Sequence, residues 1–321
     1  MRAGGSLTRL VLGGALTLAL LAGCAHAPAP TVTPRARPAG LVPPPPAPPP
    51  EPSERSEELR TYYARVQTEL LAQGLLRQDG GGIDTPFTAR QLAQNFERIA
   101  LYDEYARGGG LRAVANAPSH LRRWTSPVRI GVEFGASVPL DQRAEDTAII
   151  DDYAARLGRL SGHSVSTVGS GANFNVLVMG EDDRAEAIAR IRRIVPDISG
   201  ASLDIFRTLP RSIHCLVVAF SGGGTDYQYR RAIAFVRAEH PDLMRKSCYH
   251  EELAQGLGLA NDSPDARPSI FNDDDEFALL TSMDEMMLRM LYDPRLRPGM
   301  TPDEARPIVS DMAEELVGGS S

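Results

Sequence analysis

The chain has 321 residues and a formal net charge of −7, with 41 acidic and 34 basic side chains. Its short basic stretches are interrupted by acids, which argues against a nucleic-acid partner. The single tryptophan and the low aromatic content, 6%, argue against a carbohydrate-stacking groove.

The N-terminus has the pattern of a bacterial export signal that ends in a lipid-modified cysteine. Residues 1–23 combine two early arginines with an apolar run over 10–21, which is too short to span a bilayer permanently. Leu21–Cys24 matches a lipobox, so we expect Cys24 to be acylated and to hold the chain on a membrane. Ala25 after this cysteine favours the outer membrane, with the protein facing the periplasm. The alternative is an ordinary signal peptide followed by an incidental cysteine.

The segment 24–52 is rich in proline. After Cys24 it holds 12 of the 25 prolines of the chain, including the run Pro43–Pro46. Such a composition favours extended polyproline II and cannot build a packed core. At about 3.1 Å per residue, it could hold the folded part up to ~80 Å from the lipid. We interpret it as a tether, with a proline-rich ligand for a partner as the weaker alternative.

Two helical patterns then define a predicted N-terminal extension over residues 53–122. Ser53–Leu76 and Thr88–Tyr105 both place apolar residues at helical spacing. Glycine runs follow each of them, at 80–82 and at 108–110. Because about 270 residues follow the tether, they can form one large domain or a core domain with a helical extension.

The main domain is predicted over residues 123–321. Its elements are, in chain order, a strand over 128–134, a helix over 140–160, a strand over 173–179, a helix over 182–194, strands over 215–220 and 231–237 joined by a glycine-rich loop at 221–226, and a helix from Pro241 to about Gly256. This order predicts an α+β fold with a mixed twisted sheet and a long backing helix. The glycine-rich loop lacks the lysine and hydroxyl residue of a phosphate loop, so we interpret it as a hairpin.

Two cysteines besides Cys24 lie in the main domain, Cys215 in an apolar strand and Cys248 in the last helix of that series. A pair of cysteines in an exported protein favours a disulfide. The bridge would contribute roughly 3–4 kcal/mol on the chain-entropy model. The alternative is a pair of separate buried thiols.

The segment Glu251–Asp262 resembles the zinc-binding helix of a metzincin, H-E-x-x-H-x-x-G-x-x-H, without its zinc-binding residues. The three ligand positions hold Glu251, Gln255 and Asn261, the position of the general base holds Glu252, and the turn glycine is Gly258. Residues four positions apart lie on one face of a helix, so the side chains of Glu251 and Gln255 would point the same way. The glycine would let the chain turn sharply and bring Asn261 or Asp262 back toward them.

The chemistry of these positions decides which cofactor is expected. Catalytic zinc is held mostly by imidazoles, whereas a carboxylate and two amides form a harder and weaker set. We therefore expect no zinc and no other cofactor, although such oxygen donors would suit a hard divalent ion. Shifting the register to begin at His250 fails, because its fifth position is Ala254. We interpret His250 as a packing or surface residue, and the acidic run 272–276 as a solvated loop.

The next segment extends the resemblance. Phe271 lies where metzincins carry the methionine of a tight turn, and Leu280–Asp284 continues to Leu291–Tyr292 like their closing helix. Together with the segment Cys248–Leu259 and the run Leu291–Met300, these residues resemble a family of proteobacterial lipoproteins, domain of unknown function 2927. The resemblance implies a zincin-like domain over 123–321, and it brings no established activity.

These observations predict a non-catalytic envelope lipoprotein that binds a peptide or protein in a former substrate groove. This hypothesis rests on two observations: all three zinc-binding histidines are replaced, and the rest of the metzincin-like pattern is retained. The alternative is a peptidase-like hydrolase in which Glu252 is the general base and the neighbouring Glu251, Gln255 and Asn261 position a metal or a water.

Overall fold

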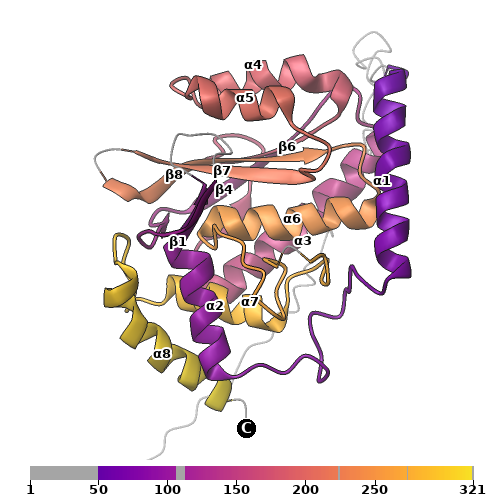
Figure 1. The fold of residues 1–321 in the computed structure, drawn as a ribbon. Coiled ribbons are helices and arrows are strands. Elements are labelled where there is room, and N and C mark those ends of the chain that lie inside the picture. Colours follow the sequence, from indigo (N-terminus) through magenta and orange to yellow (C-terminus); the bar gives the residue numbers. More distant parts are fainter. Residues whose placement is uncertain (1–49, 106–112, 223–224, 273, 320–321) are drawn as a thin grey trace, which may run out of the picture. The chain divides into compact units, whose positions relative to one another are not determined.

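The computed structural model describes residues 50–105, 113–222, 225–272 and 274–319, which fall within one unit, Pro48–Ser321. It has the predicted mixed α/β architecture, built on a central sheet (Figure 1). The export signal, Cys24, nearly all of the proline-rich segment and the glycine run at 108–110 lie outside the described residues. Within the described ranges, none of the helices combines the length and the apolar character that a membrane span requires.

The sheet is mixed, with one antiparallel strand. Its strands are β3 (Arg123–Trp124), β4 (Val128–Phe134), β5 (Val165–Thr167), β6 (Phe174–Met179), β7 (Cys215–Gly222) and β8 (Thr225–Arg237). The order is β5-β4-β6-β8, with all neighbours parallel, and β3 extends the sheet by a short parallel pairing with β8. β7 pairs antiparallel with β8, and in the described part of the chain it has no other strand neighbour. β7 is therefore an edge strand.

Helices cover both faces of the sheet (Figure 1). One face carries α3 (Leu140–Ser161) and α6 (Asp242–Leu257), and the other carries α4 (Arg184–Ile194) and α5 (Gly200–Thr208). All six residues of β6 are buried, as expected for a strand covered on both faces. The two sets of its alternating side chains enter two hydrophobic clusters, so β6 separates the two layers of the core.

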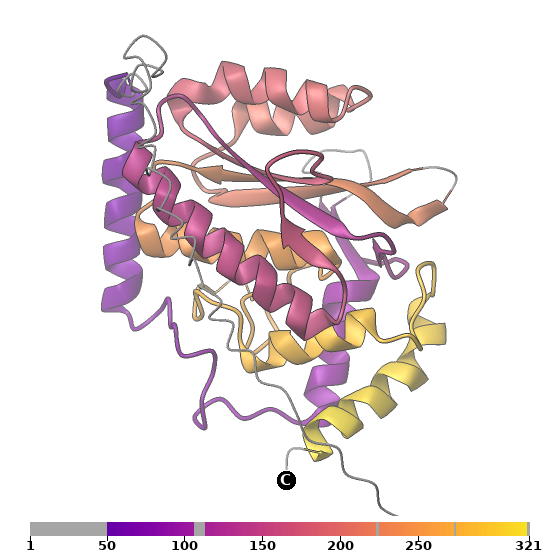
Figure 2. The same ribbon diagram turned by 180° about the vertical axis from the view of Figure 1, so that it is seen from behind.

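The larger cluster continues away from the sheet into a second layer of helices. These are α2 (Ala89–Leu101), α7 (Ser282–Tyr292) and α8 (Pro302–Gly318), which pack beyond α3 and α6 (Figure 2). Leu92 and Phe96 of α2 belong to the same cluster as Val128 and Phe174 of the sheet. Part of the segment 53–122 therefore contributes directly to the main core.

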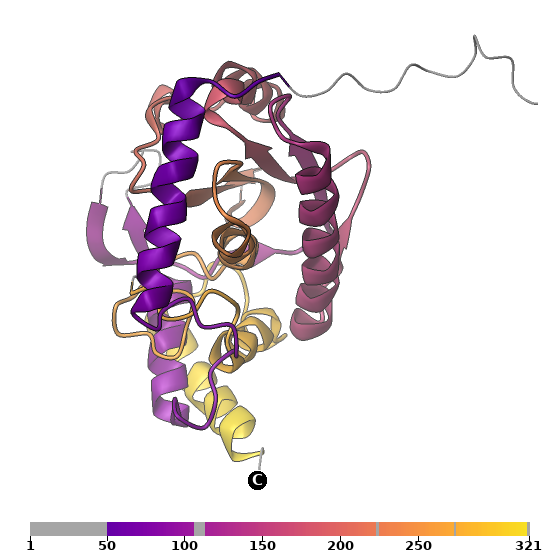
Figure 3. The ribbon, with the colours of Figure 1, turned by 90° about the vertical axis from the view of Figure 1, so that its right-hand side faces the viewer.

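The first helix, α1 (Glu54–Ala72), crosses the N-terminal end of α6 (Figure 3). Its buried residues are Ser56, Leu59 and Tyr63, and the hydroxyl of Tyr63 donates a 3.0 Å hydrogen bond to the carbonyl of Arg211. Gln67 accepts a hydrogen bond from the backbone N–H of Met244 at the start of α6. Ser53 caps α1 by accepting from the N–H of Ser56.

Several elements differ from the sequence-based prediction. The helix expected over Thr88–Tyr105 ends at Leu101, and its last four residues form β1 (Tyr102–Tyr105), which pairs with β2 (Ala113–Pro118). The strand expected over 231–237 begins six residues earlier, at Thr225, because the polar segment before it pairs with β7. The helix expected over 182–194 begins as a 3₁₀ turn at Glu181–Asp183. The elements β2, β3, β5, α5 and α8 were not predicted.

Candidate functional site

The helix that carries the zincin-like pattern, α6, lies directly under the sheet, and a glycine allows its close approach. A Cβ at Gly256 would lie 2.4 Å from a ring carbon of Phe174 and 3.2 Å from Val217. A side chain at this position would fit only if the buried ring of Phe174 moved, so the glycine permits the close packing of α6 on β6 and β7. The sequence pattern therefore contains a packing glycine in addition to the predicted turn glycine.

The turn after α6 is fixed by contacts from distant parts of the chain. Gly258 has φ +134°, and a Cβ there would lie 2.4 Å from the carbonyl oxygen of Arg122. The indole N–H of Trp124 donates to the carbonyl of Gly256 at 2.8 Å, and the hydroxyl of Tyr292 donates to that of Leu257 at 2.9 Å. These bonds satisfy carbonyls that the end of a helix leaves without partners. Tyr292, which helped to suggest the family, is thus a helix cap.

Beyond the turn, the chain returns to α6 through Asp262. The side-chain amide of Gln255 donates a 2.8 Å hydrogen bond to a carboxylate oxygen of Asp262. Asn261 is fully buried, and its side-chain N–H₂ donates to the carbonyl of Arg98 in α2. Of the two residues that the sequence offered for the third ligand position, the structure brings Asp262 to Gln255.

Two adjacent carboxyl groups, Glu251 and Glu252, lie beside the first residue of β7. One carboxylate oxygen of each and the Sγ of Cys215 lie within 4.8 Å of one another. Glu251 is partly exposed, whereas Glu252 is only 2% exposed. The Oε2 atom of Glu252 is buried with no hydrogen-bond partner among the described residues. Burial raises the pKa of Glu252 well above its usual value, and the nearby charges of Glu251 and Asp262 raise it further.

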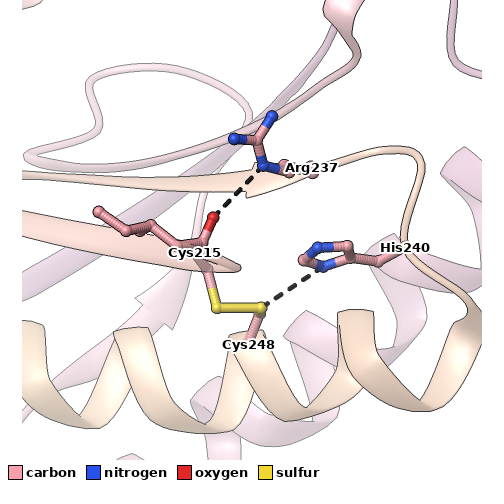
Figure 4. Close-up of a disulfide and its surroundings, with 5 residues drawn as sticks. Cys215, Arg237, His240 and Cys248 are labelled. Carbon is pink, nitrogen blue, oxygen red and sulfur yellow. Dashed lines mark hydrogen bonds between the residues drawn. A yellow bond between two sulfur atoms is a disulfide. The ribbon is translucent and has the colours of Figure 1, made fainter. Parts of the chain in front are cut away.

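The predicted disulfide between Cys215 and Cys248 is present and links β7 to α6 (Figure 4). The Nδ1 atom of His240 lies 3.8 Å from the Sγ of Cys248, and the guanidinium of Arg237 donates to the carbonyl of Ile213. Cys248 lies one helical turn before the carboxyl pair, so the bridge holds the edge strand beside it. Because Cys215 is oxidised, its sulfur cannot act as a thiolate ligand.

His250 is a buried packing residue, in agreement with the interpretation of the sequence. Its ring stacks on that of Tyr153 with 4.0 Å between centroids, and its Nδ1 accepts a hydrogen bond from the N–H of Leu280. The tyrosine hydroxyl donates to the His250 carbonyl at 2.7 Å. Burial lowers the pKa of His250 to about 3, so the imidazole is neutral at physiological pH.

The turn that contains Phe271 is held by Asp284, a residue whose role the sequence pattern did not reveal. Phe271 is fully buried, and its carbonyl accepts from the N–H of Ser263, just after the Asp262 segment. Asp284 accepts from the hydroxyl of Ser269 at 2.5 Å and from the N–H groups of Ile270 and Thr281. The aspartate of the closing helix therefore fixes the loop behind the candidate site.

The acidic loop at 272–276 includes Asp273, which lies outside the described residues. Of the others, Glu276 forms ion pairs with Arg77 and Arg267. Arg77 also pairs with Asp79 and Asp84, so it joins this loop to the segment after α1. These ion pairs therefore help to hold the loop in place at the protein surface.

We expect Glu252→Gln to stabilise the fold at neutral pH. Between its ordinary pKa near 4.5 and its raised folded pKa, the native state binds more protons than the unfolded state. Stability therefore falls as pH rises through that window, by up to about 1.4 kcal/mol per pH unit, and glutamine removes this loss. Urea unfolding at pH 4 and pH 7 should show a gain of more than about 1 kcal/mol at pH 7 only.

The matched control for this experiment is Glu69→Gln, which changes an exposed side chain on α1. It should leave stability unchanged at both pH values. An equal gain at pH 4 and pH 7 for Glu252→Gln would show that the buried charge is not the source of the effect.

The model of a family described as Protein of unknown function (DUF2927) matches residues 89–311. No curated protein and no solved structure matches the chain. The match begins at the first residue of α2 and ends within α8, so it includes the sheet, α6 and the closing helix.

Proposed function

The chain belongs to the family described as Protein of unknown function (DUF2927), and we propose that it is a zincin-like envelope lipoprotein that binds an extended peptide without cleaving it. The lipid would be carried by Cys24, and the protein would face the periplasm from the outer membrane. The arrangement of β7 and α6 is the observation that carries the binding function.

An edge strand beside the signature helix supports peptide binding by strand addition. β7 is eight residues long and uses one edge to pair with β8, which leaves its other edge without a strand in the described part of the chain. Such an edge offers backbone N–H and C=O groups to an added strand. In a zincin, a substrate lies along this kind of edge, over the helix that holds the metal.

The donor groups at the zincin ligand positions do not fit zinc. Glu251 offers a single carboxylate, and Gln255, whose side-chain N–H₂ donates to Asp262, offers only a neutral amide oxygen. Asn261 also offers only a neutral amide oxygen, which is buried without a hydrogen-bond partner among the described residues while its N–H₂ donates to the carbonyl of Arg98. The nearby Cys215 is oxidised. A catalytic zinc site requires three strong donors, usually with several imidazoles. This donor set supports a binding role in preference to metal-dependent hydrolysis.

One observation favours the alternative, a hydrolase with Glu252 as general base. A buried carboxyl group with a raised pKa is a common feature of catalytic sites. Glu252 would also reduce stability at neutral pH, and residues of that kind are often kept for function. A buried carboxyl group that binds a ligand would also have a raised pKa and a cost in stability, so these two features do not by themselves favour cleavage.

The test is to incubate the full-length chain, purified in detergent without chelator, with an immobilised library of extended octapeptides. We expect binding without cleavage by mass spectrometry. N-methylation of alternate residues along one peptide edge should abolish binding, because it removes the backbone donors of an added strand. Methylation along the other edge should leave binding unchanged.

Two outcomes would replace the binding role with a catalytic or metal-binding one, and a third would remove it. One is peptide cleavage that disappears in Glu252→Gln, which would establish the hydrolase. The other is one equivalent of metal by elemental analysis that is lost in Glu251→Ala/Gln255→Ala, which would restore a metal site. Absence of binding to every peptide would remove the groove function altogether.

A further inference from the structure

We propose that Glu251 and Glu252 receive a basic side chain, lysine or arginine, of an extended peptide added to β7. This inference rests on the proposed peptide-binding function and specifies which peptides are bound. It follows from the position of the carboxyl pair at the start of the edge strand, from an unpartnered buried oxygen, and from the sign of the surrounding charge.

The carboxyl pair would lie beside one particular residue of a strand added to β7. Cys215 is the first residue of β7, and its Sγ lies within 4.8 Å of an oxygen of each carboxyl group. Cys215, Val217 and Ala219 pack on the cluster that contains α6, whereas the residues between them pack on the opposite cluster. A peptide residue opposite Cys215 that points to the α6 face would have its side chain next to the pair, because opposed residues have Cβ atoms about 5 Å apart.

An unpartnered buried atom points to a ligand at this place. The Oε2 of Glu252 is buried and has no hydrogen-bond partner in the described part of the chain, and the residue is only 2% exposed. Buried polar groups nearly always have partners, and those without one call for an explanation. An incoming ammonium or guanidinium group would supply that hydrogen bond.

The sign of the surrounding charge selects a cation. Among the described residues, Glu251 and Asp262 are the charged groups that raise the pKa of Glu252, and both are acidic. A hard metal ion takes six or more oxygen ligands, so at this carboxyl pair water would have to supply most of them. An ammonium group has three donors and a guanidinium has a planar fork that fits carboxylates, so a pair of carboxyl groups is enough for either.

The experiment measures binding of four acetylated and amidated octapeptides to the full-length chain in detergent. The peptides share an alternating serine and valine background and carry lysine, arginine, norleucine or glutamate at one central position. We expect the two basic peptides to bind at least tenfold more tightly than the norleucine peptide, and the glutamate peptide to bind most weakly. Raising the salt concentration should reduce the preference for the basic peptides.

The variant Glu251→Gln/Glu252→Gln should bind the basic and norleucine peptides equally, whereas Glu69→Gln should keep the full preference. Equal binding of all four peptides to the wild-type chain would overturn this inference and leave the proposed function standing. Binding of none of the peptides would overturn both. Because the comparison among peptides uses the wild-type chain, it remains decisive if the double variant fails to fold.

Discussion

Replacing Asp146 with alanine is expected to lower the free energy of unfolding by about 3–5 kcal/mol. Asp146 lies in α3 and is fully buried, and both of its carboxylate oxygens accept hydrogen bonds from the Nε of Arg245 in α6, at 3.0 and 3.1 Å. Without this carboxylate, the buried guanidinium of Arg245 would lose its principal counter-charge. Urea unfolding monitored by circular dichroism would measure the loss.

A double variant separates the cost of an unpaired charge from the value of the pair. Burial raises the pKa of Asp146 even though Arg245 opposes the shift, so the loss of hydration outweighs the attraction. Replacing both partners with apolar residues is therefore expected to be much less harmful than replacing one. Asp146→Ala/Arg245→Met should recover most of the stability, apart from the 2.7 Å hydrogen bond that Arg245 donates to the carbonyl of His240. A loss below about 1 kcal/mol in the single variant would show that Asp242, the other carboxylate partner of Arg245, compensates.

The buried pair also explains why α6 has a fixed position relative to α3. Sequence periodicity predicted both helices, because their apolar stripes are local patterns. It did not predict the pairing of residues 99 positions apart. The same limit applies to Asp284, whose partners Ser269 and Ile270 lie in an irregular loop that has no periodic pattern.

In the candidate site, the sequence predicted the residues that are close together along the chain, but not the contacts made by distant segments. The pattern identified the helix, the adjacent glutamates and the turn glycine, since these are neighbours along one helix or follow it directly. It left open whether Asn261 or Asp262 returns to the helix. That choice depends on Gly258, whose space is limited by the carbonyl of Arg122, and on the hydrogen bond from Asn261 to Arg98. Both contacts come from segments more than 100 residues earlier.

For β8, the local sequence pattern predicted a strand that is shorter than the one in the structure. The segment 225–230 is polar with two tyrosines, and it lacks the apolar run that marked 231–237. It is a strand because Tyr229 pairs with Ser221 of β7 across a bulged ladder. β-propensity depends strongly on such pairing partners, which single-sequence patterns do not contain.

Removing the disulfide with Cys215→Ala/Cys248→Ala is expected to cost roughly 3–4 kcal/mol of stability. The two cysteines are 33 residues apart, so their bond restricts the unfolded chain over the whole segment from β7 to α6. The measurement is urea unfolding of wild type and variant, with and without reductant. Reductant should lower the stability of the wild type and leave that of the variant unchanged.

The functional consequence of this loss distinguishes a structural bridge from one that also shapes the site. If the disulfide holds β7 beside the carboxyl pair, the variant should bind extended peptides more weakly under conditions in which it is still fully folded. The preference for basic peptides should fall as well, because Cys215 places the start of the edge strand beside Glu251 and Glu252. Unchanged binding and preference in the folded variant would show that packing around Gly256 alone aligns the strand and the helix. The disulfide would then stabilise the fold without positioning the site.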